Sequence, residues 1–220
     1  MRIGVLLHGC GVFDGTEIHE AVLTLLSLNR AGAEVICIAP NKDQMHVVNH
    51  ITGDVIIGIK RNILEESARI ARGYVKDINT VSVDDIDGLI IPGGFGAAKN
   101  LCDFAINGEN CTVDPSVEAF IKEVHSKRKP IGAICIAPAL VAKILGKDIE
   151  LRLTVGSDRA TAEKINKMGA VHIECPVNDF VVDEKYRIVS TPAYMLGPGI
   201  KDIADGIDGL VKAVLELAAK

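Results

Sequence analysis

The chain has 220 residues, of which 48% are hydrophobic, so it is long enough to bury a large core without covalent cross-links. It carries 24 basic and 29 acidic residues, and this net charge of −5 with scattered lysines and arginines excludes the basic surface of a nucleic-acid-binding protein. It also excludes strong binding to an anionic membrane, and no apolar run reaches the roughly 20 residues of a membrane-spanning helix.

The six cysteines indicate the compartment. They stand at positions 10, 37, 102, 111, 135 and 175, without a CxxC pair or a regular spacing. Such a pattern is typical of free thiols in a reducing compartment, and the opening MRIGVLLHG is too short for a signal peptide, so we expect a cytoplasmic protein. His8 and Cys10 lie close together, but no second ligand pair follows at a zinc-binding spacing, and we expect no metal.

Short apolar strands alternate with amphipathic helices along the whole chain. This order predicts a single domain over residues 1–220, an α/β fold with a mostly parallel sheet and helices on both faces. In chain order we expect strand 2–9, helix 17–30 capped by Thr16, strand 34–40, a small β-hairpin excursion over 46–60, helix 63–73, strand 87–94, helix 115–127, strand 129–135, helix 136–145, strand 152–158, helix 160–169, strands 171–175, 179–183 and 187–191, and helix 206–219.

Cys135 stands at a sudden junction between a strand and a helix. It ends the apolar run KPIGAIC, and IAPALVAKIL follows at once, with small Ala133 and Ala137 on either side. This pattern predicts a nucleophile elbow, which holds a side chain in strained backbone at the carboxyl end of the sheet. The N-terminal end of the following helix should lower the pKa of the thiol. A buried core cysteine is the alternative.

Two glycine-rich segments follow other strands, at the edge where such sheets place their ligands. In IIPGGFGAAKN, Gly93 and Gly94 could direct N–H groups at an oxyanion, together with the N–H of Ile136. A plain tight turn would explain the same glycines.

The other segment, GCGVFDGTEIHEAV, places Glu17, His19 and Glu20 at the start of the first helix. Either glutamate could reach the Cys135 sulfur and act as a general acid or base. Acidic residues also stabilise a helix N-terminus whatever the function.

No histidine is placed to complete a Cys-His hydrolase. Ile136 occupies the position after the nucleophile, and the loop at 191–199 offers Tyr194 but no histidine. His125 and His172 lie in unsuitable elements. Amide hydrolysis by a Cys-His-acid triad is therefore disfavoured.

Five segments together resemble the PfpI and class I glutamine amidotransferase-like superfamily, most closely its ElbB-type members, which have been linked to isoprenoid biosynthesis. The segments are GCGVFDGTEIHEAVLTLL (9–26), IIPGGFGAAKNL (90–101), ENCTVD (109–114), AICIAPA (133–139) and STPAYML (190–196). The likeness spans essentially the whole chain. It implies a flavodoxin-like three-layer sandwich, a homodimer, and Cys135 as the nucleophile.

The resemblance also implies an acidic partner for Cys135. Glu20 matches best when the helix is aligned on its Arg30-Ala31-Gly32 end, and Glu17 is the second choice. Gly94 would belong to the oxyanion pocket. Asp158 stands where relatives often carry a histidine, and we take it as a stand-in.

The superfamily includes cofactor-independent glyoxalases and protein deglycases, so the resemblance implies a lyase that acts on small reactive dicarbonyls. The thiolate would add to glyoxal or methylglyoxal, a carboxylate, Glu20 by preference, would move the proton between carbons, and water would release a 2-hydroxy acid. Such a reaction needs no cofactor, metal or glutathione. Two alternatives stay open: a redox-sensing or ligand-binding protein without turnover, and an amidotransferase-like module that serves a partner.

Overall fold

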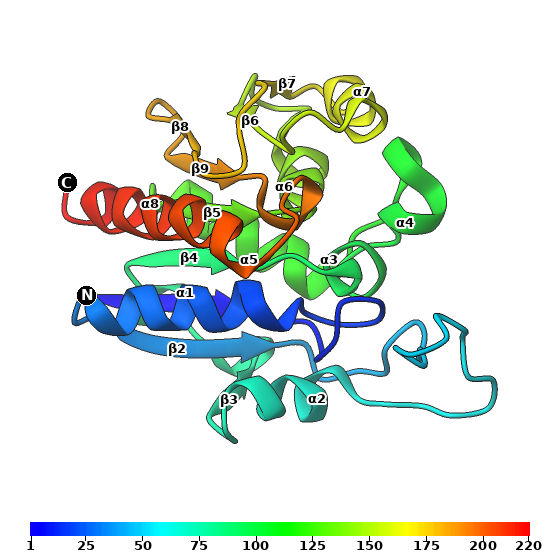
Figure 1. Ribbon diagram of the computed structural model, residues 1–220. Helices are drawn as coiled ribbons and strands as arrows, with labels where there is room; N and C mark the ends of the chain where they lie inside the picture. Colours follow the sequence, from blue (N-terminus) through cyan, green and yellow to red (C-terminus); the bar gives the residue numbers. More distant parts are fainter.

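The computed structural model describes residues 1–220, and it is built on one seven-stranded central sheet (Figure 1). The strands run in the order β3 (Val75–Asp77), β2 (Glu34–Ala39), β1 (Arg2–Leu6), β4 (Gly88–Ile91), β5 (Ile131–Ile134), β9 (Ile188–Thr191) and β8 (Val181–Asp183). Only the β8–β9 pair is antiparallel. The expected α/β class with a mostly parallel sheet is therefore confirmed.

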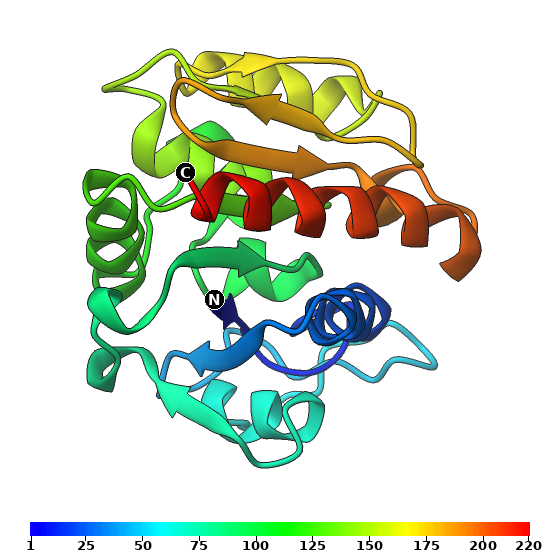
Figure 2. The same cartoon turned by 90° about the vertical axis from the view of Figure 1, so that its left-hand side faces the viewer.

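Helices cover both faces of the sheet, as the two views show (Figures 1 and 2). One face carries α1 (Ile18–Arg30), α2 (Ile63–Ile70) and α8 (Ile200–Ala218), and the other carries α3 (Phe95–Lys99), α4 (Phe104–Asn107), α5 (Pro115–Ser126), α6 (Ala137–Leu145) and α7 (Arg159–Lys167). The three-layer sandwich follows from this arrangement.

The core consists of one hydrophobic cluster on each face. Strand β4 shows how the sequence divides between them: Leu89 and Ile91 pack into the cluster with α5 and α6, whereas Ile90 packs into the cluster with α1 and α8. Successive strand side chains point to opposite faces. A strand buried on both faces therefore needs a continuous apolar run such as GLII or IGAI.

Several boundaries differ from the sequence-based expectation. Glu17, rather than Thr16, caps α1, because the Thr16 hydroxyl accepts a hydrogen bond from the His8 N–H. The run expected as strand 152–158 forms only β6 (Arg152–Leu153), which pairs with β7 (Val171–His172) in a separate two-stranded sheet. Helix α8 begins six residues earlier than expected, and the short elements β3, α3 and α4 carry no periodic pattern of their own.

The excursion at 46–60 reverses direction, but it forms no regular hairpin. A single antiparallel bridge joins Val48 and Val55, and a turn closes with the Gly53 N–H donating to the Asn49 carbonyl at 2.7 Å. None of the helices is both long and apolar enough to cross a membrane.

Candidate active site

Cys135 occupies the strained turn that the sequence predicts. Strand β5 ends at Ile134, Cys135 has φ 62°, and α6 begins at Ala137. A positive φ is uncommon outside glycine and costs conformational energy. The Cys135 N–H donates to the Thr191 carbonyl at 3.0 Å, which continues the β5–β9 ladder and fixes the turn. The nucleophile-elbow geometry is confirmed.

The two glycine-rich segments meet at this turn. The Glu17 N–H donates to the Gly93 carbonyl at 2.8 Å, and the Gly96 N–H donates to the Gly15 carbonyl at 2.9 Å. A Cβ atom on Gly93 would collide with the Cys135 Cβ and with Glu20 Oε2. The glycine is needed here for close approach between the backbone, the thiol and the carboxyl group.

Two backbone donors surround the sulfur. The N–H groups of Gly94 and Ile136 both act to lower the pKa of Cys135, as donors near a sulfur do. Gly94 has φ 98°, a left-handed conformation that favours glycine, and this conformation brings its N–H into the site. Donors in this position are suited to stabilise negative charge on the sulfur or on an oxygen bonded to the carbon it attacks.

Glu20 is the carboxyl group that lies against the thiol. Its side chain is fully buried, Oε2 accepts the Gly93 N–H at 2.8 Å, and Oε1 accepts the Tyr194 N–H at 3.2 Å. The carboxyl group and the Cys135 side chain are neighbours, because a Cβ atom on Gly93 would touch both. Burial, together with the nearby charge of Glu17, raises the pKa of Glu20 to about 8. Glu20 is therefore mostly protonated at neutral pH.

The expectation of a lowered thiol pKa is wrong. Burial and the charge of Glu20 raise the pKa of the Cys135 thiol well above its ordinary value, and the Gly94 and Ile136 N–H groups oppose this only in part. A buried thiolate loses its hydration, and the free energy of this loss exceeds the stabilisation that the helix N-terminus gives to the thiolate. At neutral pH the resting pair therefore holds a proton on both groups.

Glu17 faces the cavity in front of Cys135. Its Oε2 accepts the Glu20 N–H at 2.7 Å, and its side chain lines the cavity. His19 Nδ1 lies 3.8 Å from Glu17 Oε1 and 2.8 Å from the Tyr194 hydroxyl. The two glutamates thus occupy different places, one beside the thiol and one at the cavity wall.

The cavity has a volume of about 390 Å³, and nine of its thirteen lining residues are hydrophobic. Cys135, Gly94, Ile136 and Glu17 line it, as predicted from their segments. Two further residues line it, Tyr194 and Lys164 on α7. Neither of them has a role predicted from the sequence. No local pattern marks Lys164, because only packing of α7 over the sheet edge brings it to the site.

Asp158 lies outside the cavity. Its carboxylate caps α7 by accepting the Thr161 N–H at 2.7 Å. No histidine lines the cavity either. His8 is fully buried beneath the glycine turn with Nε2 3.0 Å from the Pro92 carbonyl, and burial lowers its pKa to about 4. No group of three or more potential ligands could hold a metal ion.

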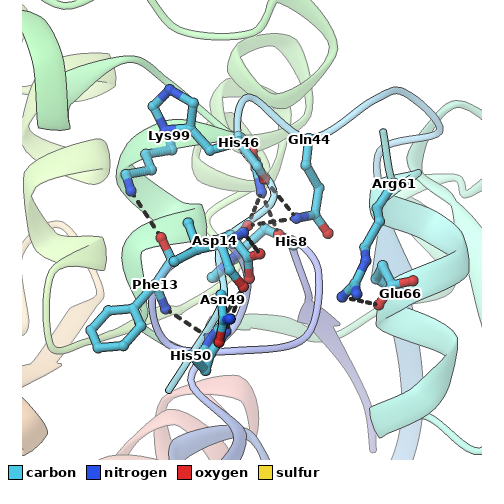
Figure 3. A network of polar contacts seen from close by, with 12 residues as sticks. His8, Phe13, Asp14, Gln44, His46, Asn49, His50, Arg61, Glu66 and Lys99 are labelled. Carbon is cyan, nitrogen blue, oxygen red and sulfur yellow. Dashed lines mark hydrogen bonds and ion pairs between the residues drawn. The ribbon is translucent and has the colours of Figure 1, made fainter. Parts of the chain in front are cut away.

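A buried polar network fixes the loop that leads to Glu17 and Glu20 (Figure 3). Asp14, at its centre, is almost fully buried. Its carboxylate accepts the Val48 N–H at 2.7 Å, and its carbonyl accepts from the Gln44 amide at 3.0 Å. His50 Nε2 lies 3.8 Å from Asp14 Oδ1 and accepts the Phe13 N–H. The excursion therefore stabilises the loop that precedes α1.

Asn100 completes this network, and its loss should destabilise the protein. Its amide donates to the His8 and Asp14 carbonyls, both at 2.8 Å, and its oxygen accepts the Met45 N–H at 2.9 Å. We expect Asn100→Ala to lower the free energy of unfolding by about 3 kcal/mol, because buried backbone groups lose their partners. Urea unfolding measures this. The control is Asn107→Ala, at an exposed position, with an expected loss of under about 0.5 kcal/mol; equal losses would contradict the assignment.

The buried Glu20 should make stability depend on pH. Its pKa is about 8 in the folded protein and 4.5 ordinarily, so between these values only the unfolded chain gives up the proton. The free energy of unfolding should therefore fall as pH rises through this window, by at most about 1.4 kcal/mol per pH unit. Urea unfolding between pH 5.5 and 7.5, a window of about two pH units, should show a weaker fall in Glu20→Gln. The same slope in both proteins would refute the assignment.

Comparison with known proteins adds to this geometry. Residues 10–191 match the model of the DJ-1/PfpI family. The chain is 47% identical to the Homo sapiens glutamine amidotransferase-like class 1 domain-containing protein 3, mitochondrial, over all of this chain and 84% of that protein. It is 46% identical to the Rattus norvegicus ES1 protein homolog, mitochondrial, over all of this chain and 85% of that protein.

Among solved structures, the chain is similar to an isoprenoid biosynthesis protein with an amidotransferase-like domain from Ehrlichia chaffeensis. The TM-score is 0.91 at 40% identity, over 98% of this chain and 99% of the other. Drosophila melanogaster DJ-1beta shares the fold with a TM-score of 0.54 at 19% identity, over 99% of this chain and 95% of the other.

The expected cytoplasmic location is contradicted by these findings. The relatives at 47% and 46% identity are both named as mitochondrial. The expectation rested on free cysteines and a short apolar N-terminus. Free thiols do not distinguish one reducing compartment from another.

Proposed function

Because the chain belongs to the DJ-1/PfpI family, which includes glyoxalase-like members, we propose that it is a cofactor-independent glyoxalase-type enzyme. The observation that carries the proposal is the placement of the buried Glu20 carboxyl group beside Cys135, with Gly94 and Ile136 next to the thiol in the wall of a cavity. A thiol, an acid-base partner and preformed donors are the groups that carbonyl addition requires.

The first step is addition to an aldehyde carbonyl. The ionised fraction of Glu20 takes the thiol proton as the Cys135 sulfur bonds to the carbonyl carbon. The oxyanion accepts hydrogen bonds from the Gly94 and Ile136 N–H groups, and then takes the proton from Glu20. The product is a neutral hemithioacetal on Cys135, and Glu20 is again ionised.

The second step moves a hydrogen between the two substrate carbons. Glu17, which lines the cavity, removes the proton from the sulfur-bearing carbon, and that electron pair forms the carbon–carbon double bond of an enediolate. Glu17 then returns the proton to the neighbouring carbon. The hydroxyl proton passes to the former second carbonyl oxygen, so that a thioester of the 2-hydroxy acid remains on Cys135.

Hydrolysis completes the cycle. Water adds to the thioester carbon, the carbon–sulfur bond breaks, and the sulfur takes a proton. Glyoxal plus water thus yields glycolic acid, with the thiol restored and no net oxidation. The chain supplies the thiol itself, so glutathione is not needed.

Amide hydrolysis is less well supported, because it requires a base to activate the thiol and an acid to protonate the leaving nitrogen. No histidine lines the cavity to perform both tasks. Membership of the ElbB-type subgroup is part of the proposal, and the Ehrlichia chaffeensis protein, named for isoprenoid biosynthesis, supports it. The expected homodimer stays a prediction.

The test is turnover of glyoxal by the purified protein in D₂O, with EDTA present and glutathione absent. We expect glycolate with deuterium on the carbon that Glu17 protonates, because a carboxyl proton exchanges with solvent. ¹H and ¹³C NMR measure both product and label. No glycolate above the level of protein-free buffer would refute the proposed function.

A further inference from the structure

The cavity in front of Cys135 is larger than glyoxal or methylglyoxal requires. Its volume of about 390 Å³ lies in the range of about 300–1,000 Å³ that is typical of pockets for larger ligands. One water molecule takes about 30 Å³, and either dicarbonyl is only a few times larger. Most of the cavity would remain unfilled around such a substrate.

Most of the cavity lining is apolar. Val12, Phe95, Phe104 and Met195 lie in its lining, and they come from four different segments of the chain. Apolar walls bind a hydrophobic group by removing its surface from water. The lining therefore favours a substrate with a hydrophobic body attached to the reacting carbonyl.

Lys164 is the only cationic side chain in the lining. It is half-buried, and its ammonium group stands 5.5 Å from the centroid of the Phe104 ring. Its charge helps to lower the pKa of Glu109, but the direct ion pair of Glu109 is with Lys167. Lys167, on the same helix, is exposed and pairs with Glu109 at 3.0 Å. Figure 1 shows α7 and α4 beyond the same edge of the sheet. An unpaired ammonium at an apolar wall is suited to bind an anion.

We infer that the substrate of this site is an aldehyde or ketoaldehyde with a hydrophobic body and a terminal anionic group, which pairs with Lys164. The inference rests on the proposed function for the reacting end, where Cys135 attacks the carbonyl. The anionic end depends on the cavity and Lys164 alone. A carboxylate and a phosphate share the required chemistry.

Binding of unreactive probes tests the ligand class separately from catalysis. Calorimetry on Cys135→Ala protein compares 2-naphthoate and 2-naphthyl phosphate with neutral 2-naphthamide. We expect both anions, or one of them, to bind more tightly than the amide, and Lys164→Met to weaken the anion about five- to tenfold. Lys164→Arg should restore binding, and the matched control Lys167→Met should leave it unchanged. The stronger anion identifies the terminal group.

Three results would overturn the inference: no binding of any probe, equal binding of anion and amide, or an anion preference that survives Lys164→Met. Turnover of glyoxal, phenylglyoxal and 4-carboxyphenylglyoxal by protein with Cys135 intact then separates the two ideas. We expect kcat/KM to rise in that order, and Lys164→Met to remove the advantage of 4-carboxyphenylglyoxal over phenylglyoxal. A Lys164-dependent anion preference without any turnover would refute the proposed function and support the ligand class. Glyoxal turnover without an anion preference would support the proposed function and refute the ligand class.

Discussion

Replacing Cys135 with alanine is expected to reduce dicarbonyl turnover by about a thousandfold or more. The sulfur forms the covalent bond to substrate in every later step, and no other thiol lines the cavity. Alanine keeps a Cβ at the strained φ of 62°, so the turn should be retained. Initial rates of glycolate formation measure the effect, and near-ultraviolet circular dichroism checks the fold.

Cys10 provides the matched control. It is a half-exposed thiol in the first loop, and it lies outside the cavity lining. Cys10→Ala should therefore retain nearly full turnover. Equal glycolate formation by wild-type and Cys135→Ala protein would refute the nucleophile assignment, and loss of activity in Cys10→Ala alone would transfer the role to that residue.

Replacing Glu20 with glutamine is expected to lower kcat/KM by about 10² to 10⁴-fold. Glutamine keeps the shape of the side chain and an acceptor for the Gly93 N–H, but it cannot take the thiol proton. In the wild type, kcat/KM should rise with pH until Glu20 is ionised at about pH 8, and then level off. The variant should lose this rise, which a purely structural effect would not produce.

Glu17→Gln separates the two carboxyl groups. It should permit addition to Cys135 and block the transfer of the proton between carbons, so that the hemithioacetal accumulates. Full turnover in Glu20→Gln together with no addition in Glu17→Gln would show that the two roles are reversed. Thermal unfolding of both variants confirms that each remains folded.

Local sequence signals were sufficient for the framework of the site. The run from KPIGAIC into IAPALVAKIL encodes both the buried strand and the following helix, so the strained position of Cys135 could be read without long-range information. The glycines at 93 and 94 likewise predict a turn from the local sequence. Their second role, close approach to Glu20 and Glu17, depends on contacts across the sheet edge.

Long-range packing determines three features of the site that local sequence patterns do not predict: which glutamate lies beside the thiol, the direction of the thiol pKa, and the place of Lys164. Glu17 and Glu20 begin the same helix, and only the Gly93 and Tyr194 N–H groups, from distant segments, place Glu20 beside the thiol. The direction of the thiol pKa depends on burial, which no local motif measures. Lys164 sits on a polar helix like any surface lysine until α7 packs over the cavity.

The most direct test of the Cys135 mechanism is ¹³C NMR of Glu17→Gln protein mixed with ¹³C-labelled glyoxal. The mechanism predicts a protein-bound hemithioacetal carbon that accumulates in this variant, and that disappears when Cys135→Ala is added to it. It also predicts faster growth of the signal at pH 8 than at pH 6, because Glu20 must lose its proton to accept that of the thiol. A signal of equal size in the double variant, or none in either protein, would contradict this mechanism.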